Sequence, residues 1–122
     1  MKSYTILIVE DNPTNRKILV DLLGVQGYST IVAEDGVAGV EMAIGNRPDL
    51  ILMDVQLPKM DGYEATRRIR AESSTKDIPI VIVTSFAMKG EEQTALAEGA
   101  SAYVSKPIDI HKLMETVKKF LP

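Results

Sequence analysis

Three carboxylates stand out because each lies at the end of an apolar run rich in strand-forming residues. Glu10 and Asp11 follow "TILIV" at residues 5 to 9, and Asp54 follows "LILM" at 50 to 53. A carboxylate beside a buried strand is costly unless a cation, a proton or a hydrogen bond compensates it. Grouped carboxylates therefore indicate a site for Mg²⁺, which takes oxygen ligands and commonly shares them with a phosphate.

One of these carboxylates is also a candidate nucleophile. An aspartate can receive a phosphoryl group covalently, and Asp54 is the best placed of the three because it ends a rigid strand. Lys106 follows "SAYVS", and Thr84 ends "IPIVIVT". A lysine charge and a threonine hydroxyl both suit phosphoryl oxygens, so this residue set has the parts that phosphoryl transfer needs.

The elements that must position these residues alternate along the chain. Short apolar runs, mostly without alternation, predict parallel strands buried on both faces. These runs lie at residues 5 to 9, 29 to 33, 50 to 53, 78 to 84 and 101 to 105. With helical segments between them, they predict an α/β fold: a doubly wound five-stranded parallel sheet of order 2-1-3-4-5, flanked by five helices. The first and third strands are then neighbours, so the three carboxylates converge.

The first and last helices carry boundary signals. Asn12 is expected to cap the first helix, with Pro13 in its first turn and Gly27 at its end, and Asp109 is expected to cap the last. The first helix has an apolar face of Ile18, Leu19, Leu22 and Leu23. The residues expected to dock the last helix onto the sheet are Ile110, Leu113, Met114, Val117 and Leu121.

Composition limits the class of protein. A chain of 122 residues with 45% hydrophobic and 25% charged residues fits one globular domain. A net charge of -3 gives no electrostatic footprint for nucleic acid. The first apolar run is too short for a signal peptide or a membrane span, and the lack of cysteine suits a reducing compartment. We therefore expect a cytoplasmic protein with one site and no membrane partner.

The pattern of Glu10-Asp11, Asp54, Thr84 and Lys106-Pro107 at strand ends resembles the receiver domain of two-component response regulators, the CheY-like family, over essentially the whole chain. The resemblance implies one receiver domain over residues 1–122 and no effector domain. It implies that a histidine kinase or a histidine phosphotransfer protein phosphorylates Asp54, with Mg²⁺ required for gain and loss of the group. Such a protein is a phosphoacceptor and not an enzyme that turns over an external substrate.

The resemblance also implies a role for each matching residue. Mg²⁺ would be bound by Glu10, Asp11 and Asp54, with Glu10 acting through water, and by the backbone carbonyl of Gln56. Thr84 and Tyr103 match the switch pair, whose rearrangement reports phosphorylation. Lys106 matches the lysine that binds the phosphoryl group, and in this family the peptide bond before the residue matching Pro107 is usually cis.

Output is expected through protein binding. The stretch "SFAMKGEE" at residues 85 to 92 resembles single-domain regulators of the DivK kind. The expected surface joins the fourth helix, the fifth strand and the fifth helix, with Phe86 or Met88 contributing contacts. In the family, the positions of Gln56 and Phe86 flank the path of the water that hydrolyses the phosphoryl group. A polar Gln56 and a bulky Phe86 do not determine the lifetime of the phosphorylated state.

The chain and several of its single residues allow other interpretations. The chain fits equally a receiver excised from a hybrid kinase or larger regulator, and a receiver can also serve as an interaction module independent of phosphorylation. A flavin or nucleotide protein is disfavoured because Glu10 and Asp11 would repel a phosphate, and a haloacid dehalogenase-type phosphatase because Gln56 replaces its second aspartate. Among single residues, Asp11 alone would read as a helix cap and His111 as an exposed, inert side chain. The basic run Arg67, Arg68 and Arg70 would read as a solvated face.

Overall fold

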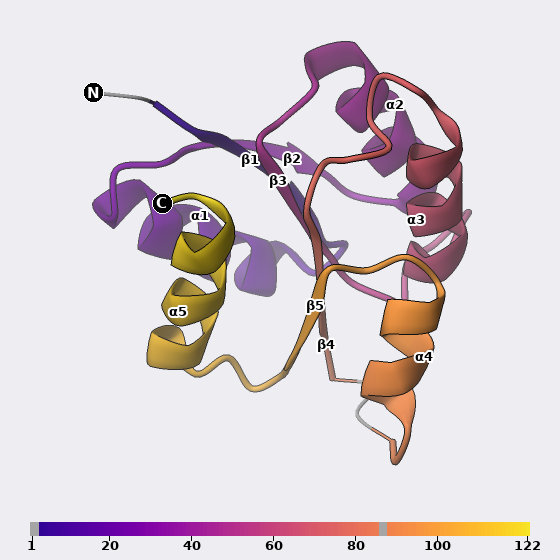
Figure 1. Ribbon diagram of the computed structural model, residues 1–122. Coiled ribbons are helices and arrows are strands. Elements are labelled where there is room, and N and C mark those ends of the chain that lie inside the picture. The colour runs from indigo at the N-terminus through magenta and orange to yellow at the C-terminus, as the bar shows by residue number, and fades with distance from the viewer. Residues whose placement is uncertain (1–2, 86–87) are drawn as a thin grey trace.

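The protein alternates strands and helices throughout, as a computed structural model describing residues 3–85 and 88–122 shows (Figure 1). The strands are β1 Thr5–Val9, β2 Ser29–Ala33, β3 Leu50–Met53, β4 Ile80–Thr84 and β5 Ala102–Ser105. The helices are α1 Pro13–Val25, α2 Gly36–Asn46, α3 Gly62–Ala71, α4 Glu91–Ala97 and α5 Ile110–Phe120. No helix within the described ranges is long and apolar enough to cross a bilayer.

The strands form one parallel sheet of order β2-β1-β3-β4-β5, which confirms the predicted fold class. In its register Val9, the last residue of β1, pairs with Ala33 of β2 and with Met53 of β3. The residues that follow Val9 and Met53 therefore lie at the same edge of the sheet. This pairing sets Glu10 beside Asp54, since parallel strands end together at one edge of the sheet.

Helices cover both faces of the sheet, with α1 and α5 on one face and α2, α3 and α4 on the other (Figure 1). Successive strand residues point to opposite faces, so alternate residues enter two separate cores. In β1, Ile6 and Ile8 pack with α1 and α5, whereas Leu7 and Val9 pack on the opposite face. Every residue of β3 and β4 is buried, as the unalternating apolar runs predict.

Helix starts follow the local sequence. The side chain of Asn12 accepts a hydrogen bond from the amide of Asn15, with Pro13 in the first turn, and that of Asp109 accepts one from the amide of Lys112. Both predicted caps are confirmed. Because Asn12 is the cap of α1, Asp11 is not needed for that role and its carboxylate is available to the site.

Several details differ from the prediction. Ile110 and Ile18 are exposed, so neither docks its helix onto the sheet as expected. Ile110 is the first residue of α5, and Ile18 lines a groove together with Pro107 and Ile108. The edge strand β2 is only partly buried, because it has a neighbouring strand on one side alone. The fourth strand begins at Ile80, because Pro79 has no amide proton to donate to a ladder.

The turn after β3 depends on a glycine. The amide of Gly62 donates to the carbonyl oxygen of Val55 at 2.8 Å, and a Cβ atom at Gly62 would overlap the carbonyl oxygen of Asp54. The loop therefore folds back tightly against the strand end that carries Asp54. Any larger residue must displace this backbone, because the clash is with main-chain atoms and not with a movable side chain.

We predict that Gly62→Ala lowers the free energy of unfolding by roughly 1–3 kcal/mol, because the added methyl group overpacks the loop. Gly45→Ala is the matched control: it lies in α2 with no heavy atom within 4 Å of the added carbon. Urea unfolding should show that Gly45→Ala gains about 0.5–1 kcal/mol. Equal stabilities of Gly62→Ala and the wild type would contradict the close approach.

Candidate active site at the carboxyl edge of the sheet

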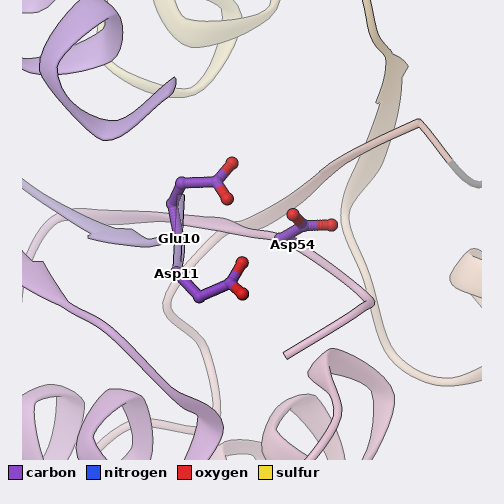
Figure 2. A group of neighbouring side chains, drawn as sticks. All are labelled: Glu10, Asp11 and Asp54. Atoms are coloured by element: carbon purple, nitrogen blue, oxygen red, sulfur yellow. The ribbon is translucent and has the colours of Figure 1, made fainter. Parts of the chain in front are cut away.

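Three carboxylates meet where β1 and β3 end (Figure 2). One ligand oxygen from each of Glu10, Asp11 and Asp54 lies within 4.8 Å of the others. Glu10 is only 2% exposed and Asp54 8% exposed, whereas Asp11 faces solvent. Such a cluster is self-repelling, so a cation or a proton must offset its charge.

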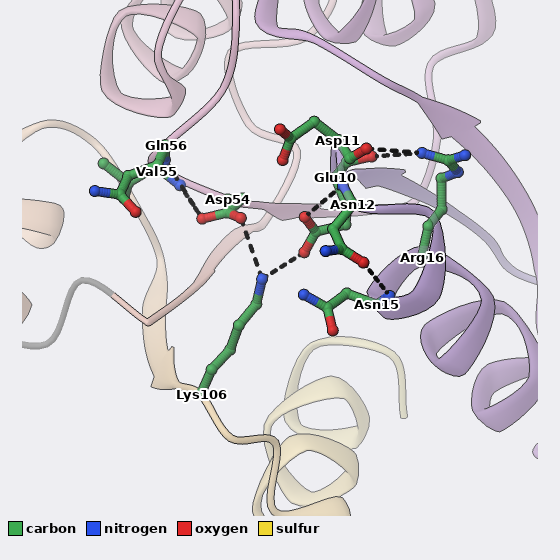
Figure 3. A network of polar contacts seen from close by, with 9 residues as sticks. All are labelled: Glu10, Asp11, Asn12, Asn15, Arg16, Asp54, Val55, Gln56 and Lys106. Atoms are coloured by element: carbon green, nitrogen blue, oxygen red, sulfur yellow. Dashed lines mark hydrogen bonds and ion pairs between the residues drawn. The ribbon is translucent and has the colours of Figure 1, made fainter.

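Lys106 provides positive charge in this structure (Figure 3). Its Nζ lies 2.5 Å from Oε1 of Glu10 and 3.1 Å from Oδ2 of Asp54. The lysine directly follows β5, its amide donates to the carbonyl oxygen of Thr84 at 2.9 Å, and the bond joining it to Pro107 is cis. The bonds to the two carboxylates and the backbone hydrogen bond to Thr84 thus direct the ammonium group into the cluster.

The second oxygen of Asp54 is held by the main chain. Oδ1 accepts a hydrogen bond from the amide of Val55 at 2.7 Å, and the amide of Gln56 lies 3.4 Å away. Asp54 is therefore fixed from both sides, by backbone amides on one oxygen and by Lys106 on the other. A carboxylate anchored in this way keeps one orientation at the mouth of the site.

The charged groups change each other's proton affinity. Burial alone would lower the pKa of Lys106, but the hydrogen bond to Glu10 and the charge of Asp54 outweigh it and raise the pKa above its ordinary value. Burial raises the pKa of Glu10, and the hydrogen bond from Lys106 offsets part of that effect. Lys106 therefore stays protonated at neutral pH.

The donor set suits a hard divalent cation. Glu10, Asp11 and Asp54 offer oxygen atoms only, the ligand type that Mg²⁺ prefers. Asp11 is the carboxylate open to solvent, which leaves room for the water molecules that Mg²⁺ usually retains. The residues present therefore fit a magnesium ion.

The remaining predicted residues lie around this cluster. Gln56 follows Asp54 by two residues and is exposed, and Thr84 is fully buried at the end of β4. Tyr103, on β5, is half-buried and packs against the core that faces α3 and α4. Met88 and His111 are exposed, while Phe86 lies outside the described residues.

Two contacts near the site could not be predicted from the sequence. Arg16 of α1 donates to the carbonyl oxygen of Glu10 at 3.0 Å, close to the candidate cation ligands. The hydroxyl of Tyr63 in α3 donates to the carboxylate of Glu91 at the start of α4. This second contact joins the two helices that flank Tyr103. Arg16 is close to Glu10 in sequence, but the contact depends on the direction in which α1 leaves the end of β1, and the contact of Tyr63 depends on the packing of α3 beside α4. Spacing along the chain therefore predicts neither.

The basic run on α3 is only partly a solvated face, which corrects the sequence-based expectation. Arg67 and Arg68 are exposed, but the guanidinium of Arg70 is partly buried. It donates to the carbonyl oxygens of Ile78 at 2.6 Å and Gly99 at 3.0 Å. Arg70 thus joins α3 to the loop before β4 and to the end of α4, because those carbonyl groups need partners where no strand provides them.

Fold and site together define a class of protein, and the chain belongs to the response regulator receiver domain family, whose pattern matches residues 6–118. It is therefore a receiver domain of two-component signalling, related to the CheY and DivK proteins. Family membership removes the flavin protein and the phosphatase as interpretations.

Individual relatives agree with this family. The chain is 43% identical over 117 residues to the polar-differentiation response regulator DivK of Brucella anthropi, covering 96% of this chain and 95% of the relative. The receiver domain of the sensor histidine kinase PA1611 of Pseudomonas aeruginosa, solved with a magnesium ion in its active site cleft, is 36% identical with a TM-score of 0.91, covering 98% of each chain. The Vibrio cholerae chemotaxis protein CheY4 is 28% identical with a TM-score of 0.90, covering 98% of this chain and 99% of that one.

We predict that Lys106→Met lowers the free energy of unfolding by about 1–3 kcal/mol at neutral pH, because Glu10 and Asp54 lose their cation. The folded pKa of Lys106 is raised, so its stabilisation is complete below the ordinary lysine value of 10.5 and is lost as pH rises through the folded pKa. Urea unfolding of both proteins should show a difference in the free energy of unfolding that is constant from neutral pH to about 10.5 and narrows above it.

The exposed Lys112→Met is the control for loss of a lysine charge on the surface. The free energy of unfolding of Lys112→Met should equal that of the wild type at every pH. A Lys106→Met protein as stable as the wild type at neutral pH would show that the ammonium group does not stabilise the cluster.

Proposed function

We propose that the protein accepts a phosphoryl group on Asp54 from the phosphohistidine of a histidine kinase or a histidine phosphotransfer protein. The observation that supports this most directly is the position of Asp54. Its carboxylate ends β3 and lies 3.1 Å from Nζ of Lys106, and it shares a cluster with Glu10 and Asp11.

The reaction is a simple displacement. A carboxylate oxygen of Asp54 attacks phosphorus, a new O–P bond forms, and the N–P bond of the phosphohistidine breaks with its electron pair left on the imidazole. The backbone amides of Val55 and Gln56 orient the attacking carboxylate. Lys106 stabilises the negative charge carried by the phosphoryl oxygens, as positioning and electrostatics require in this chemistry.

We further propose that the site holds Mg²⁺ when active. Asp11 and Asp54 would bind it directly, Glu10 through water, and Gln56 through its backbone carbonyl. The cation would neutralise phosphoryl charge and orient the transferring group. The carboxylate cluster of this chain supports the proposal, as does the magnesium-bound receiver domain of PA1611.

The signal would leave the site through Thr84 and Tyr103. In the proposed switch the hydroxyl of Thr84 moves to a phosphoryl oxygen and the ring of Tyr103 turns inward, which biases the surface of α4, β5 and α5 between two states. Receiver domains interact with histidine kinases and with downstream targets. We place the downstream partner of this chain on that surface, where exposed Met88 would contribute a contact.

In this proposal the protein is a cytoplasmic phosphoacceptor that gains and loses its own phosphoryl group. It is not an enzyme that turns over a separate substrate many times. A receiver within a hybrid kinase or a larger regulator would perform the same chemistry. A module that signals without phosphorylation is the second candidate. The intact set of Asp54, Lys106, Glu10 and Asp11 favours the phosphoacceptor, because a module of that kind has no need of these groups.

Intact mass spectrometry after incubation with a small acyl-phosphate donor tests the proposal. We expect the wild type to gain the mass of one phosphoryl group when Mg²⁺ is present, with a much smaller gain in EDTA. Asp54→Asn is the matched control, because it keeps the shape of the side chain and removes its negative charge, and it should gain none. A gain that persists in Asp54→Asn would place the acceptor elsewhere.

A further inference from the structure

One arginine holds the backbone of the acidic loop. Arg16 lies in the first turns of α1, and its side chain is only 18% exposed. Its Nη1 donates to the carbonyl oxygen of Glu10 at 3.0 Å, and the carbonyl oxygen of Asp11 lies 3.5 Å from the same nitrogen (Figure 3). One guanidinium group thus contacts the peptide carbonyls of both adjoining carboxylate residues.

The guanidinium is itself anchored from the opposite side. Its Nη2 lies 3.2 Å from Oε1 of Glu34, which directly follows β2. The amide of Glu10 donates to the carbonyl oxygen of Ala33 at 3.0 Å, so the ends of β1 and β2 are also joined by the main chain. Arg16 therefore joins three places: the helix α1, the acidic loop and the end of β2.

From these contacts we propose that Arg16 is a positioning residue for the divalent cation site, holding the loop so that the carboxylates of Glu10 and Asp11 face Asp54. This inference rests on the proposed function, because it assigns a role toward the Mg²⁺ of that site. The guanidinium bonds main-chain carbonyl oxygens of the loop, whereas the hydrogen bonds to the Glu10 carboxylate come from Lys106 and from the amide of Asn12. It acts through backbone geometry and does not touch the cation.

The sign of a mutational effect separates positioning from simple electrostatics. Arg16 adds a positive charge near a site for a positive ion, so loss of that charge alone would strengthen Mg²⁺ binding. Loss of positioning would weaken it, since residues that orient metal ligands typically affect affinity by about 10- to 100-fold. The two explanations therefore predict changes in opposite directions.

The experiment compares Mg²⁺ affinity, measured by calorimetry, in the wild type, Arg16→Met, Arg16→Lys and Lys17→Met. Lys17 is the matched control: it is the neighbouring residue of α1, its side chain is 76% exposed, and it pairs with Asp21 within the helix. We expect Arg16→Met to bind Mg²⁺ on the order of 10-fold more weakly than the wild type. Arg16→Lys should recover part of this loss, and Lys17→Met should bind as tightly as the wild type or more tightly.

A second readout needs no metal. In EDTA, hydrogen exchange at the amides of Asp11 and Asn12 should be faster in Arg16→Met than in the wild type, and unchanged in Lys17→Met, because Arg16 bonds the carbonyl groups of this loop whereas Lys17 pairs with Asp21. Faster exchange together with weaker Mg²⁺ binding supports the inference.

Two results would overturn it. If Arg16→Met binds Mg²⁺ as tightly as the wild type or more tightly, Arg16 does not position the cation ligands, and the proposed function is unaffected. Faster hydrogen exchange in that variant would then show that Arg16 only stabilises the loop. A wild type that binds no Mg²⁺ refutes the metal site of the proposed function, and this inference falls with it.

Discussion

The mutual repulsion of three carboxylates at one edge of the sheet is the constraint on which the rest of the structure depends. Glu10 and Asp54 are almost fully buried there, and water cannot screen their charges as it screens those of surface groups. In this structure the ammonium group of Lys106 bonds both of them. The repulsion between the carboxylates destabilises the fold, and the same negative charge favours binding of a cation. Stability and the proposed function therefore depend on the same interaction, between the carboxylates and a cation.

The fold turns this constraint into a defined geometry. The register of β1 between β2 and β3 sets Glu10 beside Asp54, and the cap of α1 falls on Asn12, which leaves Asp11 free for the site. The close approach of Gly62 fixes the turn that follows Asp54. Each of these features acts on the backbone and so fixes the main-chain positions from which the carboxylates extend.

Much of this architecture follows from local rules. Strand order, the caps at Asn12 and Asp109, and the meeting of Glu10, Asp11 and Asp54 could all be predicted, because periodicity, capping chemistry and parallel pairing are readable in sequence. Contacts made by long side chains between distant elements could not. Three such contacts depend on how the helices pack: Arg16 with Glu34, Arg70 with Gly99, and Tyr63 with Glu91. The spacing of Ile110 predicts a core position, but this residue is exposed in the first turn of α5.

Titration of Mg²⁺ into the wild type and into Asp11→Asn tests the central claim most directly. Asp11 is the solvent-facing carboxylate, and the bonds of Lys106 go to Glu10 and Asp54, so this change leaves the resting network in place. If the cluster is a cation site, the wild type binds one ion per chain, and Asp11→Asn binds it at least about tenfold more weakly. No binding by the wild type, or equal binding by both proteins, would contradict it.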